Sequence, residues 1–89
     1  MKTRDELRAE IDAIDSQLLD LLNRRAALAV EIAGLKVREG IPILDPDREN
    51  HVVDRARAGS REPLEPDAAE RIFRAVMRES RRLQARFVD

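Results

Sequence analysis

The sequence predicts an all-α fold with three helices per protomer, one long, one short and one of medium length. Apolar residues recur in steps of three and four, which is the period of an amphipathic helix. Aromatic residues make up only 2% of the chain and charged residues 39%, so any core must be aliphatic. The four prolines fall between the periodic stretches or at their starts, where they end one helix or open the next.

The first expected helix spans about residues 4–38. Thr3 and Glu6 form a capping-box pattern at its start, in which the hydroxyl bonds forward and the carboxylate reaches back to the cap. Gly40 and Pro42 mark its end, because glycine suits a C-terminal cap and proline cannot continue a helix. Its apolar positions are Leu7, Ile11, Ile14, Leu18, Leu21, Leu28, Ile32 and Leu35.

Two shorter helices are expected over about residues 46–58 and 66–87. Asp45 is suited to cap the second helix, and a proline opens each of the two. At 89 residues, the chain is expected to form one domain over residues 1–89. The loop before the second helix is too apolar for a free linker, and we expect it to pack against the helices through Ile41, Ile43 and Leu44.

The length of the first helix predicts an intertwined homodimer. About 35 residues form a rod of roughly 50 Å, whereas a compact chain of this size is only about 30 Å across. Two short helices can cover part of the rod, and the rest needs a second protomer. A two-fold dimer is the commonest way to supply one.

Composition excludes several functions. The chain has no cysteine, so it cannot form disulfides or thiolate metal sites. His51 has no second metal ligand at a useful spacing. The net charge is -1 with mixed signs along the chain, so no bulk field attracts nucleic acid. No signal peptide or membrane-spanning stretch is visible, and we expect a cytoplasmic protein.

The apolar ladder of the first helix is interrupted by cations. Its spacing calls for an apolar residue at position 25, where the sequence has Arg25. Lys36 follows eleven residues later, three turns on and only about 20° around the helix. The two cations are therefore expected on one side of the rod.

The other helices also carry polar residues at inward positions. Arg48 and Glu49 share a helix face with Asp45, while Ser80 interrupts the apolar seam of the third helix and Gln84 follows one turn later. Unpaired charges in so small a core would cost several kcal/mol. The excess of cations therefore predicts a pocket for a small anion, with more than one carboxylate, because arginine binds carboxylates through paired hydrogen bonds.

Each of these residues has a simpler explanation on its own. Arg25 alone would usually be a snorkelling or register-setting side chain, and Arg48 and Glu49 alone could be a solvated pair. Ser80 and Gln84 alone would be unremarkable. Their coincidence on three helices favours the pocket.

Some polar and small residues are expected to have no functional role. Gly34 is interpreted as a place of close helix approach. A solvated face near the end of the third helix is expected from Arg81, Arg82 and Arg86.

This constellation resembles the all-helical (type II) chorismate mutases. The matching stretches are LRAEIDAIDSQLLDLLNRR, LAVEIAGLK, ILDPDRE and ESRRLQ, which cover nearly the whole chain in the same order. The resemblance implies an intertwined dimer in which each active site borrows a residue from the partner. It also implies the rearrangement of chorismate to prephenate, on the route to phenylalanine and tyrosine, with no covalent intermediate, metal or cofactor.

The resemblance also implies roles for individual residues. Arg25 and the partner's Arg8 correspond to the clamps for the two substrate carboxylates. Lys36 and Gln84 correspond to the donors to the ether oxygen, where negative charge grows as the C–O bond breaks.

The remaining positions resemble the rest of the family's polar lining. Glu49 corresponds to the residue that holds the substrate hydroxyl, and Asp45 assists through its backbone region. Arg48 and Ser80 complete the lining.

Two alternatives stay open at this point. An isochorismate pyruvate lyase shares this fold and pocket, so both substrates need to be assayed. A dimeric helical interaction module, in which the inward charges pair with each other, would bind no small ligand.

Overall fold

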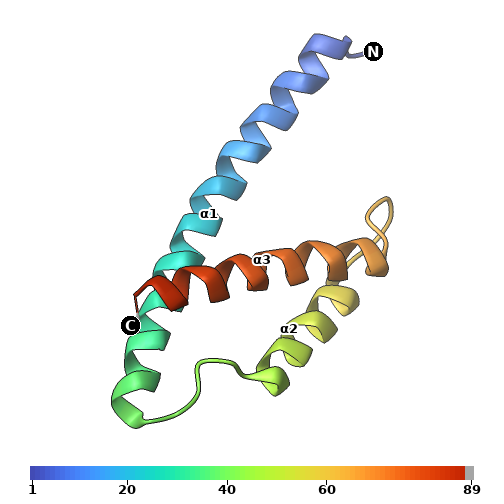
Figure 1. Cartoon of the computed structure of the whole chain (residues 1–89). Helices are drawn as coiled ribbons and strands as arrows, with labels where there is room; N and C mark the ends of the chain where they lie inside the picture. The colour runs from blue at the N-terminus through green and yellow to red at the C-terminus, as the bar shows by residue number, and fades with distance from the viewer. Residues whose placement is uncertain (88–89) are drawn as a thin grey trace.

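The computed structural model describes residues 1–87 and confirms the all-α prediction with three helices (Figure 1). Helix α1 spans Arg4–Glu39, α2 spans Pro46–Gly59 and α3 spans Pro66–Arg86. Between α2 and α3, a short turn holds one isolated antiparallel bridge from Arg61 to Leu64.

Local capping signals explain where the helices begin and end. The Thr3 hydroxyl accepts from the backbone N–H of Glu6 at 3.1 Å, and the Asp45 carboxylate accepts from that of Arg48 at 3.0 Å. The Glu6 carboxylate accepts from the Thr3 hydroxyl, so it bonds the side chain of the cap. Gly40 adopts the left-handed conformation, with φ of 71°, at the end of α1.

The protomer has an elongated shape because half of α1 projects alone. Helix α3 packs against α2 and against the C-terminal half of α1, and the N-terminal half of α1 extends away from both (Figure 1). The radius of gyration is 16.2 Å. A compact chain of this length would have about 12 Å.

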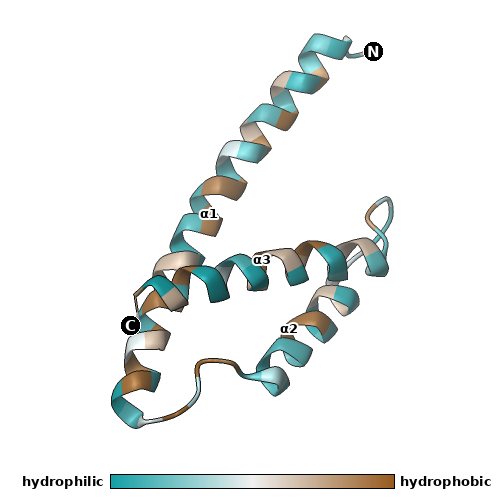
Figure 2. Cartoon of the chain, viewed as in Figure 1, coloured by the Kyte–Doolittle hydropathy of each residue, from teal (hydrophilic) through white to brown (hydrophobic). Residues whose placement is uncertain are grey.

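The core of one protomer is very small. Among residues 1–87, the buried apolar residues are Ala33, Val53, Ala69 and Met77. The apolar ladder of α1 is instead exposed along the rod, as Leu7 (49%), Leu18 (50%) and Leu21 (56%) illustrate. Brown apolar segments accordingly alternate with teal ones along its projecting half (Figure 2).

Two expectations about packing are wrong within the protomer. Ile41 and Leu44 are 47% and 56% exposed, and of the three apolar residues of that loop only Ile43 is partly buried, because the loop spans the open end between α1 and α2. Apart from Gly34 itself, its two chain neighbours and the nearby backbone of its own helix, no atom lies within 4 Å of a Cβ built on Gly34, so no other helix of the protomer approaches it closely. Within residues 1–87, no helix combines the length and apolar character that crossing a bilayer requires.

Candidate functional site

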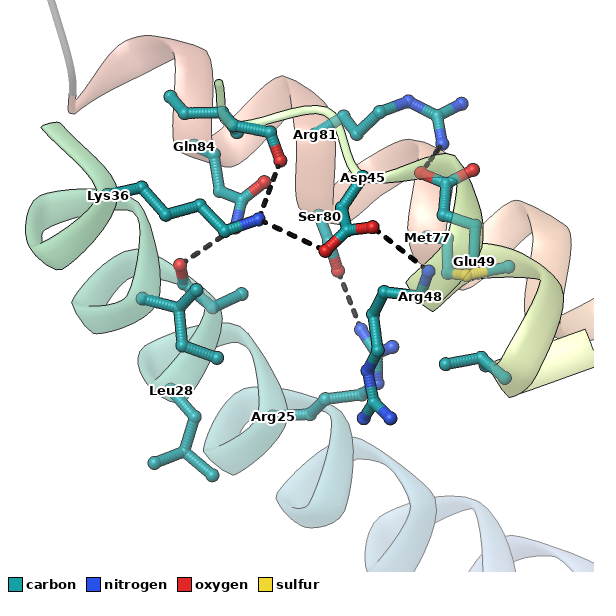
Figure 3. A pocket seen from close by; sticks show the side chains of 14 residues that line it. Arg25, Leu28, Lys36, Asp45, Arg48, Glu49, Met77, Ser80, Arg81 and Gln84 are labelled. Carbon is teal, nitrogen blue, oxygen red and sulfur yellow. Dashed lines mark hydrogen bonds and ion pairs between the residues drawn. The ribbon is translucent and has the colours of Figure 1, made fainter. Parts of the chain in front are cut away.

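A hollow of about 260 Å³ lies where the C-terminal half of α1, the start of α2 and the end of α3 meet (Figure 3). Its apolar walls come from side chains such as Leu28, Ile32 and Met77. The hollow brings together seven of the eight predicted site residues: Arg25, Lys36, Asp45, Arg48, Glu49, Ser80 and Gln84.

Lys36 is held at one end of the hollow by the loop that precedes α2. Its Nζ donates to the backbone carbonyl of Ile43 at 3.0 Å and lies 3.9 Å from Oδ2 of Asp45. Its side chain is only 20% exposed. Because an ammonium has three N–H donors, Lys36 keeps hydrogen-bonding capacity for a ligand.

Hydrogen bonds between α1 and α3 fix two further polar groups. Arg25 donates from Nη1 to the Ser80 hydroxyl at 2.8 Å, and that hydroxyl donates to the Val76 carbonyl at 3.0 Å. Gln84 donates from Nε2 to the Ala29 carbonyl at 2.9 Å. The Gln84 amide has a second N–H, which remains for a ligand. These contacts hold the donors in place before any ligand arrives.

Glu49 is paired with Arg81, which the sequence predicts to lie on a solvated face. Arg81 donates from Nη1 to Oε2 of Glu49, and both side chains line the hollow (Figure 3). The expectation that Arg81 belongs to a solvated face is therefore wrong. A periodic signal was available, since Arg81 lies four residues after the buried Met77 and three before Gln84, on the same face of α3.

The charges around the hollow are unbalanced in favour of cations. Four cationic side chains line it, and only two carboxylates, from Asp45 and Glu49, oppose them. The charged groups remain partly exposed, between 20% for Lys36 and 47% for Asp45 among those in ion pairs. They therefore avoid the full cost of burial, and the hollow suits a compact ligand that carries two negative charges.

Arg8 does not reach this hollow within one protomer. It lies on the projecting half of α1 and is exposed. It precedes Arg25 by 17 residues, which corresponds to about 25 Å along a helix.

No group of three His, Cys, Asp or Glu side chains within residues 1–87 is placed to hold a metal ion.

The fold and the hollow together define a small helical protein with a pocket in which cationic side chains outnumber carboxylates. Comparison with known proteins then gives its family, since the type II chorismate mutase family matches residues 7–85. A chorismate mutase of Methanocaldococcus jannaschii is 34% identical over 85 residues, covering 94% of this chain and 86% of that protein. The chain belongs to the type II chorismate mutase family.

Two further similarities concern ligands of the related proteins. A crystal structure of Helicobacter pylori chorismate mutase in complex with prephenate matches with a TM-score of 0.85 and 33% identity, covering 94% of this chain and 91% of that one. The 4-amino-4-deoxychorismate mutase of Streptomyces venezuelae is 52% identical over 50 residues, covering 56% of this chain and 48% of that protein.

Proposed function

We propose that the chain is a chorismate mutase, an isomerase that rearranges chorismate to prephenate on the route to phenylalanine and tyrosine. The observation that carries this proposal is that one hollow brings together seven of the polar residues that the resemblance assigns to the site, in a chain whose residues 7–85 match the family. Its excess of two positive charges complements chorismate, which carries two carboxylates. Cytoplasmic localisation, expected from the sequence, is part of the same proposal.

The mechanism requires only positioning and electrostatic stabilisation. The rearrangement is unimolecular: an ether C–O bond breaks while a C–C bond forms, so no base or nucleophile is needed. Arg25 binds a substrate carboxylate and holds the compact reactive conformer. Lys36 and Gln84 donate to the ether oxygen, where negative charge develops. Both are anchored to backbone carbonyls, which supports their role as preorganised donors.

The other polar residues orient the substrate. Glu49 accepts a hydrogen bond from the substrate hydroxyl, and Asp45 supports Lys36 and the start of α2. Arg48 and Ser80 complete the polar lining, Ser80 by holding the Arg25 guanidinium.

The active unit in this proposal is an intertwined homodimer. Arg8 cannot reach the hollow of its own protomer, and the apolar ladder beside it is exposed. An antiparallel pair of α1 helices that cross near Ser16 would cover this ladder and bring the partner's Arg8 next to Arg25. The partner's Arg8 then binds the second carboxylate.

The direct test follows the ultraviolet absorbance of chorismate and identifies the product. Conversion to prephenate is expected, and no turnover would contradict the proposal. Isochorismate is assayed in parallel, because release of pyruvate would instead identify a lyase. A dicarboxylate mimic of the transition state should raise the melting temperature, whereas a helical interaction module would show no such shift.

A second substrate is supported by one specific similarity. The 52% identity with a 4-amino-4-deoxychorismate mutase raises the amino analogue of chorismate as a candidate. Its amine can donate to the Glu49 carboxylate in place of the hydroxyl. The same assay with this analogue gives the ratio of kcat/KM between the two substrates.

A further inference from the structure

We infer that Arg81 is a positioning residue that acts through Glu49 and makes the site prefer a substrate with a neutral hydroxyl over one with a cationic amine. This inference rests on the proposed function, in which Glu49 accepts a hydrogen bond from the ring substituent of the substrate.

The geometry places Arg81 behind one oxygen of the Glu49 carboxylate. Its Nη1 donates to Oε2, and within residues 1–87 the structure gives Oε1 no hydrogen-bond partner. The Glu49 side chain is 24% exposed and that of Arg81 40% exposed, so the pair stands at the edge of the hollow rather than free in solvent (Figure 3). One carboxylate oxygen is thus held by the protein and the other remains for a ligand.

The pair links two helices, so it holds the Glu49 side chain in place relative to α3, which an ion pair within one helix cannot do. Glu49 lies in the first turn of α2 and Arg81 near the end of α3. The neighbouring Arg82 pairs instead with Glu79 on its own helix, and both of those side chains are more than 60% exposed. Arg82 therefore offers a matched control of the same type, one residue away and outside the hollow.

Fixing the Glu49 carboxylate favours binding because the side chain is ordered before the substrate arrives. A free glutamate loses rotamer freedom when it binds, and a charge-assisted hydrogen bond from arginine removes that loss in advance. We therefore expect loss of the Arg81 charge to weaken the contact between Glu49 and the substrate hydroxyl.

The same charge discriminates between substrates. An alkyl amine is largely protonated near neutral pH, so it meets the Arg81 guanidinium as a second cation beside a carboxylate that is already paired. A hydroxyl is neutral and meets no such repulsion. Since like charges a few ångströms apart repel by more than thermal energy near a protein surface, Arg81 favours chorismate over its 4-amino analogue.

The test compares Arg81→Met with Arg82→Met, because methionine keeps a long apolar stem and a good helix propensity. With wild-type protein converting chorismate, Arg81→Met should lower kcat/KM for chorismate by about tenfold or more, the usual effect of losing a hydrogen bond to a charged group. The loss for the 4-amino analogue should be smaller, so the selectivity ratio shifts by about tenfold toward the amine. Arg81→Lys should restore much of the preference, and Arg82→Met should leave both values unchanged.

A double-mutant cycle with Glu49→Gln separates the proposed role from direct substrate binding. If Arg81 acts through Glu49, adding Arg81→Met to Glu49→Gln costs little more. An equally large loss in both backgrounds would show that Arg81 binds the substrate itself and would overturn the inference. A wild-type protein that converts chorismate, with Arg81→Met equal to Arg82→Met, would also overturn it. A wild-type protein that leaves chorismate unchanged would instead contradict the proposed function.

Discussion

At the scale of single residues, Lys36 and Gln84 are held in the same way. Each side chain nitrogen donates one hydrogen bond to a backbone carbonyl, that of Ile43 or that of Ala29, and keeps at least one N–H for a ligand. The carbonyls fix the direction of the remaining donors. In the proposed mechanism, the ether oxygen gains negative charge between these donors and is stabilised without any rearrangement of the protein.

Lys36→Ala and Gln84→Ala should each lower kcat by roughly 10² or more, because each removes one preorganised donor to the developing charge. Steady-state kinetics with chorismate measures the loss. Lys2→Ala is the matched control, since Lys2 is the other lysine of the chain and lies in an exposed ion pair with Glu10. Near-normal turnover in either site variant would reject the role assigned to that residue.

Glu70 of α3 is bound by two arginines, Arg57 of α2 and Arg74 of its own helix. Its carboxylate accepts from Arg74 at 2.7 Å and from Arg57 at 2.9 Å. The hydrogen bond from Arg74, followed by that from Arg57, lowers the pKa of Glu70 below its ordinary value of 4.5, although partial desolvation opposes the change. The ionised form is therefore favoured more in the folded protein than in the unfolded chain.

Because the folded pKa of Glu70 lies below the unfolded one, its stabilisation is present above the unfolded pKa and is lost as pH falls through the folded pKa. Glu70→Gln should lower the melting temperature at pH 7, and the difference from wild type should shrink as pH falls from about 5 to 3. Thermal melts by circular dichroism measure it. Glu79→Gln, in an exposed pair within α3, should change little, and a difference for Glu70→Gln that stays constant with pH would contradict the expectation.

The polar residues of the hollow differ in how visible they are in the sequence. Arg25 stands at a position where the ladder of α1 requires an apolar residue, so its inward direction can be predicted. Arg81 is followed by Arg82 and Arg86 in the stretch ESRRLQAR, and such a group of arginines near a helix end is typical of a solvated face. Its spacing to Met77 and Gln84 places Arg81, unlike Arg82, on their face of α3. The sequence does not show that α3 packs against α2 so that Glu49 pairs with Arg81.

At the scale of elements, short-range signals determine the helix ends more clearly than the loops between them. The side chains of Thr3 and Asp45 satisfy backbone N–H groups at their helix starts, and such contacts are encoded within four residues of sequence. The positions of Ile41 and Leu44 depend on contacts across the chain, and hydrophobicity alone predicted packing that the protomer does not show. In the proposed homodimer, the partner subunit can complete such packing.

Gly34 within α1 and Gly40, the residue that caps its C-terminal end, provide a paired prediction at the scale of elements. Gly34 lies in mid-helix with open space around a built Cβ, so Gly34→Ala should raise the free energy of unfolding by about 1 kcal/mol through helix propensity. Gly40 has φ of +71°, where a side chain is strained, so Gly40→Ala should lower it by about 1 kcal/mol. Urea denaturation at one fixed protein concentration measures both, and equal signs for the two variants would contradict this account.

At the scale of the whole molecule, one protomer has little core of its own. The four small or medium side chains buried among residues 1–87 cannot offset the entropy of ordering a chain of this length, which supports the proposed homodimer. The apolar ladder of α1 could be predicted from sequence, and so could the mismatch between the rod and the expected size of the chain. The pairing of the rods is not encoded in any local pattern, because it depends on which residues of two chains meet.

The proposed exchange of arginines between protomers can be tested by complementation. Arg8→Ala and Arg25→Ala should each abolish most activity, since each removes a clamp from both sites of a homodimer. When the two variants are unfolded together and refolded as a mixture, half of the dimers should be mixed, and each mixed dimer has one site with its own Arg25 and the partner's Arg8. Activity should therefore return to about a quarter of the wild-type value.

Separately refolded variants combined just before the assay provide the control, because their subunits have had no opportunity to mix. Recovery in the mixture but not in this control would require that Arg8 acts across the dimer interface. If Arg8 instead served its own protomer, every mixed dimer would still lack one clamp in each site, and the mixture would remain as inactive as its components. The two arrangements thus predict opposite results from the same pair of substitutions, whatever the detailed geometry of the pairing of α1.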